Sequence, residues 1–394
     1  MTLRFNKQKN MISWLTKAIC IYFLSIPFDF IPIGSFGSIS KAVVFFPVLV
    51  IVLNLHRIKL SGNELAIIIF FLLVSFFSSI ISIHSSAINN WFSLFQNLSV
   101  IALLICFSYN DIEYNAIETS ILFSGIILII LFFVFNYRGE TGRQGIILMG
   151  VEQNFNYLCG YLLLPQAICL KRASQQRNKV FYYVVLTCMI VVVFLSGSRG
   201  GLLASIGIVG VYLIIYLHNK SVVLSSKILY IFSFAILSIS LVMIFERIVP
   251  DELKPRYFVQ TALSDKGSNR ILIWDSLLKS YSQFNFIDKL FGIGIGTSRF
   301  YSYNGTYAAH NVFLAYLLEC GLVGVLTYIG LLIRLGRLSI KKQCYSQFAA
   351  LVGFIIMSMT TTFTNFKPMW VLLFYMIVSI NRQEVIANTD SYRE

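Results

Sequence analysis

Two arginines and a histidine are the residues of this sequence whose types and settings suit chemistry on a phosphorylated substrate. Arg199 lies in a turn of glycine and serine, Arg270 opens an amphipathic segment, and His310 stands with Asn311 at the start of an apolar stretch. A pair of guanidinium groups can hold a diphosphate leaving group, while a neutral imidazole can take a proton from an attacking hydroxyl. These residue types favour transfer of a sugar from a lipid-linked diphosphate to a hydroxyl.

The turn around Arg199 reads Ser-Gly-Ser-Arg-Gly-Gly over residues 196–201, between two apolar stretches. It is too short to carry Arg199 far from a membrane surface, and its glycines permit close approach of other segments. An arginine beside a helix N-terminus is a natural site for a diphosphate. The alternative is an arginine that extends to lipid headgroups. The glycine and serine neighbours favour the first interpretation.

The stretch that begins with His310 contains two glycines spaced for helix packing. On a continuous helix, Gly321 would lie three turns from His310 on nearly the same face, with Gly324 close to it. This face predicts close approach by another helix. Glu319 would lie about half a turn around the helix, where we expect a buried carboxyl group that supports packing between spans.

Three other polar residues are weaker candidates. Arg143 lies in the Gly- and Arg-rich loop 137–145, for which a solvated turn is slightly favoured over a second anion-contacting loop. His84 ends an apolar stretch on the same side as His310 and is a rival to it. Asp29 follows a proline and can orient an arginine or histidine, although a solvated carboxylate at the membrane interface fits better.

The composition requires that these residues sit on a membrane protein. The chain has 394 residues, of which 57% are hydrophobic and 12% charged, so an ordinary soluble globule is excluded. Its apolar runs are long enough for membrane helices and predict an all-α polytopic protein with about twelve spans. The predicted spans are residues 12–34, 39–56, 64–84, 90–109, 115–136, 154–170, 179–197, 200–217, 226–248, 309–334, 344–365 and 368–381.

Three regions follow from this pattern. Residues 1–248 hold spans one to nine, residues 249–308 form a large exterior loop, and residues 309–394 hold spans ten to twelve and a tail. Basic residues gather in the short loops of one side, from Arg4 before the first span to Arg382 after the last. Such loops are cytoplasmic, so both termini are predicted to be cytoplasmic.

The exterior loop has two recognisable parts. From Arg270 onwards the spacing predicts an amphipathic helix along the interface, with an i,i+4 ion pair between Asp275 and Lys279. Its apolar face is expected to comprise Ile271, Trp274, Leu278 and Tyr281. The segment 290–298 then contains three alternating glycines. No lysine follows as in a nucleotide-binding loop, so we expect a tight loop that returns the chain to the membrane.

The charge and the cysteines exclude other classes of protein. The net charge of +14 is spread over short loops and forms no patch of basic and aromatic residues. This distribution indicates basic residues that orient the protein in the membrane and contact anionic lipid, rather than a surface that binds nucleic acid. The seven cysteines show no metal-ligand spacing, so neither a zinc site nor a disulfide scaffold is indicated. No metal or organic cofactor is expected.

Over roughly residues 196–330 the sequence resembles the superfamily of O-antigen ligases and O-antigen polymerases of the bacterial envelope. The strongest likeness is His310-Asn311 followed, after nine residues, by Gly-Leu-Val-Gly at 321–324, which is similar to the ligase signature. The other shared motifs are Ser-Arg-Gly-Gly at 198–201, Arg270 with Trp274, and Phe-Gly-Ile-Gly at 291–294.

The resemblance implies an undecaprenyl-diphosphate-linked glycan as donor, at the periplasmic face of the inner membrane, with no need for metal or nucleotide. Arg199 and Arg270 would bind the diphosphate, His310 would act as base or orient the acceptor, and Asn311 would support substrate binding. Arg143 is a further candidate for anion contact. A ligase would use lipid A core as acceptor, and the motif spacing favours it narrowly. A polymerase would use the next lipid-linked repeat unit.

Two other classes fit less well. A transporter or lipid-linked glycan flippase tends to place ionisable residues in the middle of the membrane. Here Glu319 is the one acid expected well inside a span, while the charged clusters lie at one surface. A purely structural scaffold leaves Arg199, Arg270 and His310 unexplained.

Overall fold

The computed structural model describes residues 12–34, 37–58, 62–139, 141–175, 178–218, 223–305 and 307–391. Of the chain, 76% is helical, which confirms the predicted all-α class. Arg4, used above to orient the chain, lies outside the described ranges, as does Glu140 of the loop 137–145. The exception to the helical character in the described part is a three-stranded antiparallel sheet.

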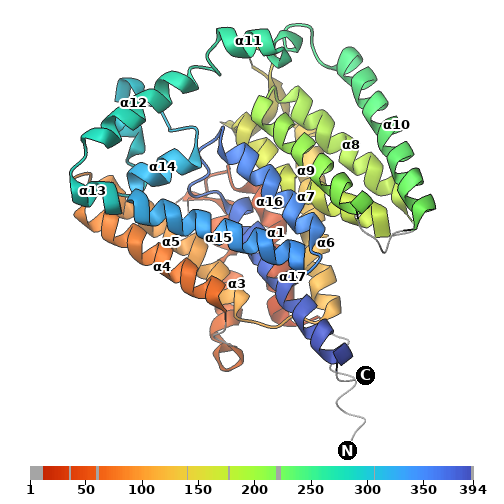
Figure 1. Cartoon of the computed structure of the whole chain (residues 1–394), viewed down its shortest axis with the longest axis horizontal. Helices are drawn as coiled ribbons and strands as arrows, with labels where there is room; N and C mark the ends of the chain where they lie inside the picture. The colour runs from red at the N-terminus through yellow and green to blue at the C-terminus, as the bar shows by residue number, and fades with distance from the viewer. Residues whose placement is uncertain are drawn as a thin grey trace, which may run out of the picture.

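The elements follow the order of the predicted spans, with short helices and strands between them (Figure 1). The first half comprises α1 (Trp14–Ser25), η2 (Ile26–Phe28), α2 (Ile39–Val43), α3 (Phe45–Val52), η4 (Leu55–Arg57), α4 (Asn63–Ile81), α5 (Ser86–Ile105), α6 (Asp111–Val134), β1 (Asn136–Arg138), β2 (Gln144–Leu148), β3 (Val151–Glu152) and α7 (Phe155–Gln175). The second half comprises α8 (Lys179–Leu195), α9 (Arg199–His218), α10 (Leu224–Ile248), η5 (Lys254–Tyr257), α11 (Val259–Ser264), α12 (Arg270–Gln283), α13 (Phe286–Phe291), η6 (Ser298–Tyr301), η7 (Tyr303–Gly305), α14 (Val312–Glu319), α15 (Gly321–Lys341), α16 (Tyr345–Ser358) and α17 (Lys367–Ser391).

Five of the described helices are long and apolar enough to cross a membrane, namely α4, α5, α6, α9 and α15. Shorter apolar helical stretches occupy residues 14–28, 39–52, 179–195 and 345–358. Helices therefore stand at the predicted positions, and a membrane protein with several spans is supported. The count of twelve stays a prediction.

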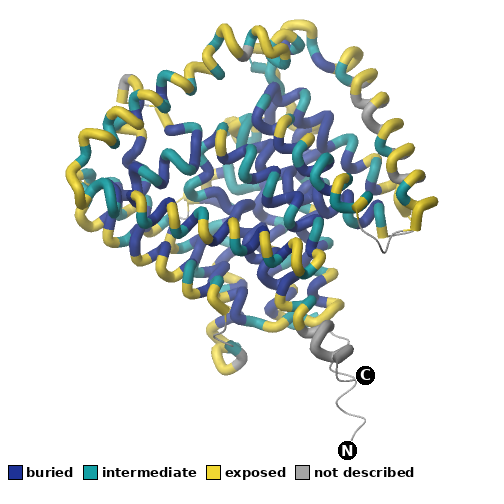
Figure 2. The backbone as a smooth tube through the Cα atoms, in the orientation of Figure 1, coloured by how far each residue is buried: buried dark blue, intermediate teal, exposed yellow. Residues whose placement is uncertain are grey.

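The centre of the bundle is the contact of α16 with α9 and α7 (Figure 1). Glycines make this contact close. A Cβ atom on Gly353 of α16 would lie 2.5 Å from Ile208 of α9, and one on Gly201 would lie 2.6 Å from Cys159 of α7. Figure 2 shows this centre as buried, whereas the chain from α10 through α12 runs around the outside and is largely exposed. Small residues thus bring the start of α9 close to neighbouring helices.

Predicted span ten is not one helix. The short helix α14 ends at Glu319, the chain breaks at Cys320, and α15 begins at Gly321 with a φ of +65°. A Cβ atom on Gly321 would lie 2.3 Å from the carbonyl carbon of Leu290. The expectation that Gly321 continues the His310 helix is therefore wrong, although Gly321 does allow another helix to approach closely, since Leu290 is part of α13. Gly321 admits the backbone at the end of α13, just before the glycine loop.

The glycine loop after α13 is tight and folds back, as the sequence predicted. Its amides at Ile293 and Gly294 donate to the carbonyl oxygens of Leu318 and Glu319 at 2.9 and 3.0 Å. The Glu319 side chain is buried as expected, but its Oε1 accepts from Ser298 Oγ of this loop at 2.6 Å rather than joining two spans. The loop therefore fixes the end of α14.

The amphipathic helix α12 begins at Arg270, as predicted, and its Asp275–Lys279 ion pair measures 2.6 Å. The predicted apolar face is wrong in part. Ile273 and Leu277 are buried, whereas Ile271 and Leu278 of the predicted set are exposed. Trp274 and Tyr281 do pack against the small core beneath the helix. Contact with α14 and η6 therefore selects a face rotated from the one expected.

Asp29 is not the solvated carboxylate that the sequence favoured. It forms an ion pair with Lys367, whose side chain is 3% exposed, and accepts from Ser38 Oγ at 2.7 Å. The pair joins the chain after α1 to the start of α17. Asp29 therefore serves packing and does not orient a histidine or arginine of the candidate site.

We predict that Gly321→Ala destabilises the protein, whereas Gly330→Ala in the same helix does not. The first substitution places a side chain at positive φ and against the backbone of Leu290, which costs about 1 to 3 kcal/mol for the conformation alone. The Cβ of the second meets no atom within 4 Å. Thermal unfolding of both purified variants in detergent tests this, and equal melting temperatures would contradict it.

Candidate active site

The site is built on the carbonyl groups that end α8 and begin the Gly-Ser turn. Arg143 Nε donates to the carbonyl oxygen of Ser196 at 2.8 Å, and Arg256 Nε donates to that of Gly197 at 2.8 Å. Carbonyl groups at the C-terminus of a helix attract cations. They bring together two arginines that are more than a hundred residues apart in the chain.

Arg199 is fixed at the first position of α9 by two acceptors. Its Nε donates to the carbonyl oxygen of Arg256, and its Nη1 donates to both carboxylate oxygens of Asp265 at 3.1 and 2.9 Å. Its Nη2 is buried and has no partner in the described part of the chain. Gly200 is needed beside it, because a Cβ there would lie 2.1 Å from Thr360 Oγ1. Arg199 therefore presents a preoriented donor that has no acceptor among the described residues.

Arg143 reaches the same place from the hairpin of β1 and β2. Its guanidinium lies 4.1 Å from the ring centroid of Phe155, and its Nη2 is buried without a partner among the described residues. Burial and then the charge of Arg256 lower the pKa of Arg143 to about 10. The solvated turn favoured by the sequence is thus wrong for Arg143, which is held among other arginines.

Arg270 joins the cluster from the start of α12. Burial, followed by the charges of Arg256 and Arg199, lowers the pKa of the Arg270 guanidinium. Burial and then the charge of Arg270 lower the pKa of His310 below its ordinary value of 6.5. These mutual effects require short separations. The charge of Arg199 thus acts on Arg270 and that of Arg270 acts on His310, which places the three residues that the sequence singled out in one region of the protein.

His310 is fixed through its backbone between α12 and the turn before α17. Its amide donates to Thr362 Oγ1 at 2.7 Å, and the preceding carbonyl, of Ala309, accepts from Trp274 Nε1 at 3.0 Å. Its φ of +49° is left-handed, which is unusual for a residue with a side chain and typical of functional sites. These backbone contacts place the imidazole without using a ring nitrogen.

Asn311 has a structural task next to this histidine. Its Oδ1 accepts from the amides of Phe313 and Leu314 at 2.9 and 3.1 Å and so caps the N-terminus of α14. Binding of substrate by its amide nitrogen stays a prediction. The rival His84 instead stacks on Phe300 at 4.5 Å and contacts Tyr301 Oη at 3.3 Å.

Sequence reasoning missed two members of the cluster, Arg256 and Asp265. Arg256 lies in the short turn η5, and its charge lowers the pKa of both Arg143 and Arg270. Neither residue belongs to a motif or a periodic face. Their position in the one long polar insertion was the available signal.

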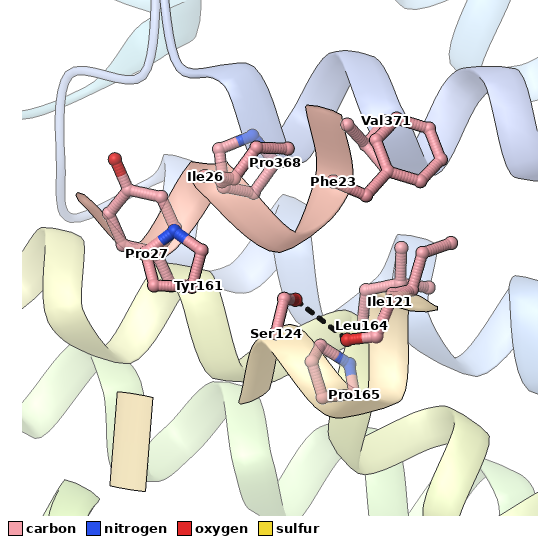
Figure 3. Close-up of a pocket in the computed structure, with 10 residues that line it drawn as sticks. All are labelled: Phe23, Ile26, Pro27, Ile121, Ser124, Tyr161, Leu164, Pro165, Pro368 and Val371. Atoms are coloured by element: carbon pink, nitrogen blue, oxygen red, sulfur yellow. Dashed lines mark hydrogen bonds between the residues drawn. The ribbon is translucent and has the colours of Figure 1, made fainter. Parts of the chain in front are cut away.

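The small cavity in Figure 3 is a separate feature of the helical core. It holds about 20 Å³, and its walls come from α1, α6, α7 and α17 with the turns beside them. Its lining is mainly apolar, and Ser124 Oγ in its wall is already bonded to the carbonyl oxygen of Ile121 at 2.7 Å. None of the clustered arginines lines it. It is therefore a packing void and not the candidate site.

Comparison with known families agrees with the geometry. Residues 184–329 match the family model described as O-antigen ligase. This segment includes Arg199, Arg256, Arg270 and His310, whereas Arg143 precedes it. The match confirms the resemblance to the O-antigen ligase and polymerase superfamily. A comparison with curated proteins found no match.

Proposed function

We propose that this protein is an O-antigen ligase that transfers a glycan from undecaprenyl diphosphate to a hydroxyl of lipid A core. The observation that carries the proposal is the group of four arginines beside His310, with two buried guanidinium nitrogens that lack a partner among the described residues. One of the four positive charges is offset by Asp265. A diphosphate would supply negative charge to offset the remaining three, and oxygen atoms to accept hydrogen bonds from the guanidinium groups.

The residues divide into two roles. Arg199, Arg270, Arg256 and Arg143 would hold the diphosphate and stabilise the charge that develops on it as it leaves. His310 would accept the proton of the acceptor hydroxyl. The bond between the anomeric carbon and the phosphate oxygen breaks, the acceptor oxygen bonds to that carbon, and undecaprenyl diphosphate leaves. The proposed reaction uses neither metal nor nucleotide.

The membrane placement is part of the same proposal. We place the site at the periplasmic face of the bacterial inner membrane, with residues 249–308 on that side and both termini in the cytoplasm. The family match supports a ligase or a polymerase in general. A polymerase would use the same donor site and a lipid-linked repeat unit as acceptor. A flippase fits less well, since transfer chemistry gives His310 and the arginines a shared task.

We expect His310→Ala and Arg270→Ala to abolish transfer while the protein remains inserted and abundant. The first removes the base and the second removes a charge from the leaving-group site. The matched control is Lys279→Ala on the same helix as Arg270, because the Lys279 side chain is 73% exposed. Electrophoresis of surface polysaccharide, with immunoblots of membranes, measures the outcome, and normal activity in either site variant would remove this mechanism.

The same analysis in cells that lack the protein distinguishes a ligase, which uses lipid A core as acceptor, from a polymerase, which uses a lipid-linked repeat unit. Long lipid-linked chains that accumulate without reaching lipid A core are the result expected of a ligase. Single repeat units on core or carrier would identify the polymerase instead. An unchanged profile would argue against both and favour transport.

The pH dependence of transfer should reflect the environment of His310. Because burial and Arg270 lower its pKa, the imidazole is neutral and able to accept a proton at neutral pH. We expect kcat/KM to be level near neutrality and to fall only below pH 6.5, the ordinary pKa of histidine. An acid limb centred above pH 7 would show that this imidazole is not the base.

A further inference from the structure

The segment between α11 and α12 has an unusual backbone. Lys266, Gly267, Ser268 and Asn269 have φ values of +48°, +66°, +62° and +64°. Three of these residues carry side chains, for which the left-handed region is unfavourable. The next residue is Arg270. The turn therefore needs support from its surroundings, and it determines where Arg270 enters the site.

Asp265 supplies that support. Its Oδ1 accepts from the amide of Ser268 at 2.9 Å, and its backbone carbonyl accepts from the amide of Asn269 at 2.9 Å. The same carboxylate receives both hydrogen bonds from Arg199 Nη1, at 3.1 and 2.9 Å. One side chain thus connects the turn before Arg270 to the guanidinium of Arg199.

The geometry of Arg199 shows what this connection achieves. Its Nε is bonded to the backbone of Arg256 and its Nη1 to Asp265, so that two contacts fix the guanidinium plane. Only Nη2 is left buried and without a partner in the described residues. A donor held in place in advance loses less entropy when it binds a ligand. Asp265 therefore sets the direction of the free donor.

We propose that Asp265 is a positioning residue, which fixes Arg199 and the turn before Arg270 so that both arginines meet one diphosphate. The inference rests on the proposed function of the site, and it assigns Asp265 no contact with substrate. A positioning role and a simple counter-charge role for Asp265 predict opposite effects on anion binding. If Asp265 were only a counter-charge, its removal would strengthen the binding of an anion to a cationic site.

The sign of the effect on pyrophosphate binding therefore tests the proposal. We would titrate the full-length protein in detergent with inorganic pyrophosphate by calorimetry and compare Asp265→Asn and Asp265→Ala. We expect weaker binding in both, by about tenfold for alanine, because loss of positioning outweighs loss of the negative charge. Asparagine should lose less, since it keeps an acceptor for the Ser268 amide. Asp275→Asn removes a carboxylate that is 58% exposed on α12 and serves as control.

A rescue variant separates positioning from general loss of folding. Ser268→Gly keeps the amide and removes the side chain that disfavours the left-handed region, so adding it to Asp265→Ala should restore part of the affinity. Equal or tighter binding in Asp265→Asn, with binding intact in the unmodified protein, would overturn this inference alone. No binding by the unmodified protein would overturn the proposed diphosphate site instead.

Discussion

Arg143 and Arg256 are bound to carbonyl groups at the end of α8, and the charges of Arg199 and Arg270 act on the same cluster. The mutual repulsion of these four arginines is the constraint on which the site depends. The carbonyl oxygens of Ser196 and Gly197 and the carboxylate of Asp265 offset part of it. What remains lowers the pKa values of Arg143, Arg256 and Arg270, after the larger effect of burial. A fold that gathers this much positive charge favours any state in which an anion occupies the site.

The surrounding helices bring the parts of this cluster from distant stretches of sequence. Close packing at Gly200 and Gly201 seats the start of α9 against α7 and the turn after α16. The glycine loop and the break at Gly321 fix α14, whose N-terminal side carries His310. His310 and the arginines thus rest on separate elements, which backbone contacts hold in place. Such rigid support is what a transfer site requires of its scaffold.

Much of this arrangement could be predicted from the sequence, and the reasons for the misses are physical. Hydropathy located the helices, and the settings of Arg199, Arg270 and His310 marked them because charges near lipid are costly. The break at Cys320 was invisible, since an apolar stretch has the same hydropathy whether it is one helix or two. The face of α12 was misjudged because contacts with α14, and not periodicity alone, decide which side is buried.

Arg256 and Asp265 were missed for another reason. Each acts through contacts with residues distant in the chain, at Gly197 and Arg199. A polar loop contains many charged residues with no such contacts, and only the tertiary structure tells them apart. Asp29 was misjudged for the same reason, since its partner Lys367 lies near the other end of the sequence.

The most direct test of the account uses purified protein in liposomes with an undecaprenyl-diphosphate-linked glycan and a chelator, without nucleotide. Lipid A core and a lipid-linked repeat unit are supplied as acceptors in separate reactions, and free undecaprenyl diphosphate is measured with the glycosylated product. The account predicts that both appear in equal amounts, and only when lipid A core is present. Movement of the intact donor across the bilayer, without release of undecaprenyl diphosphate, would contradict it.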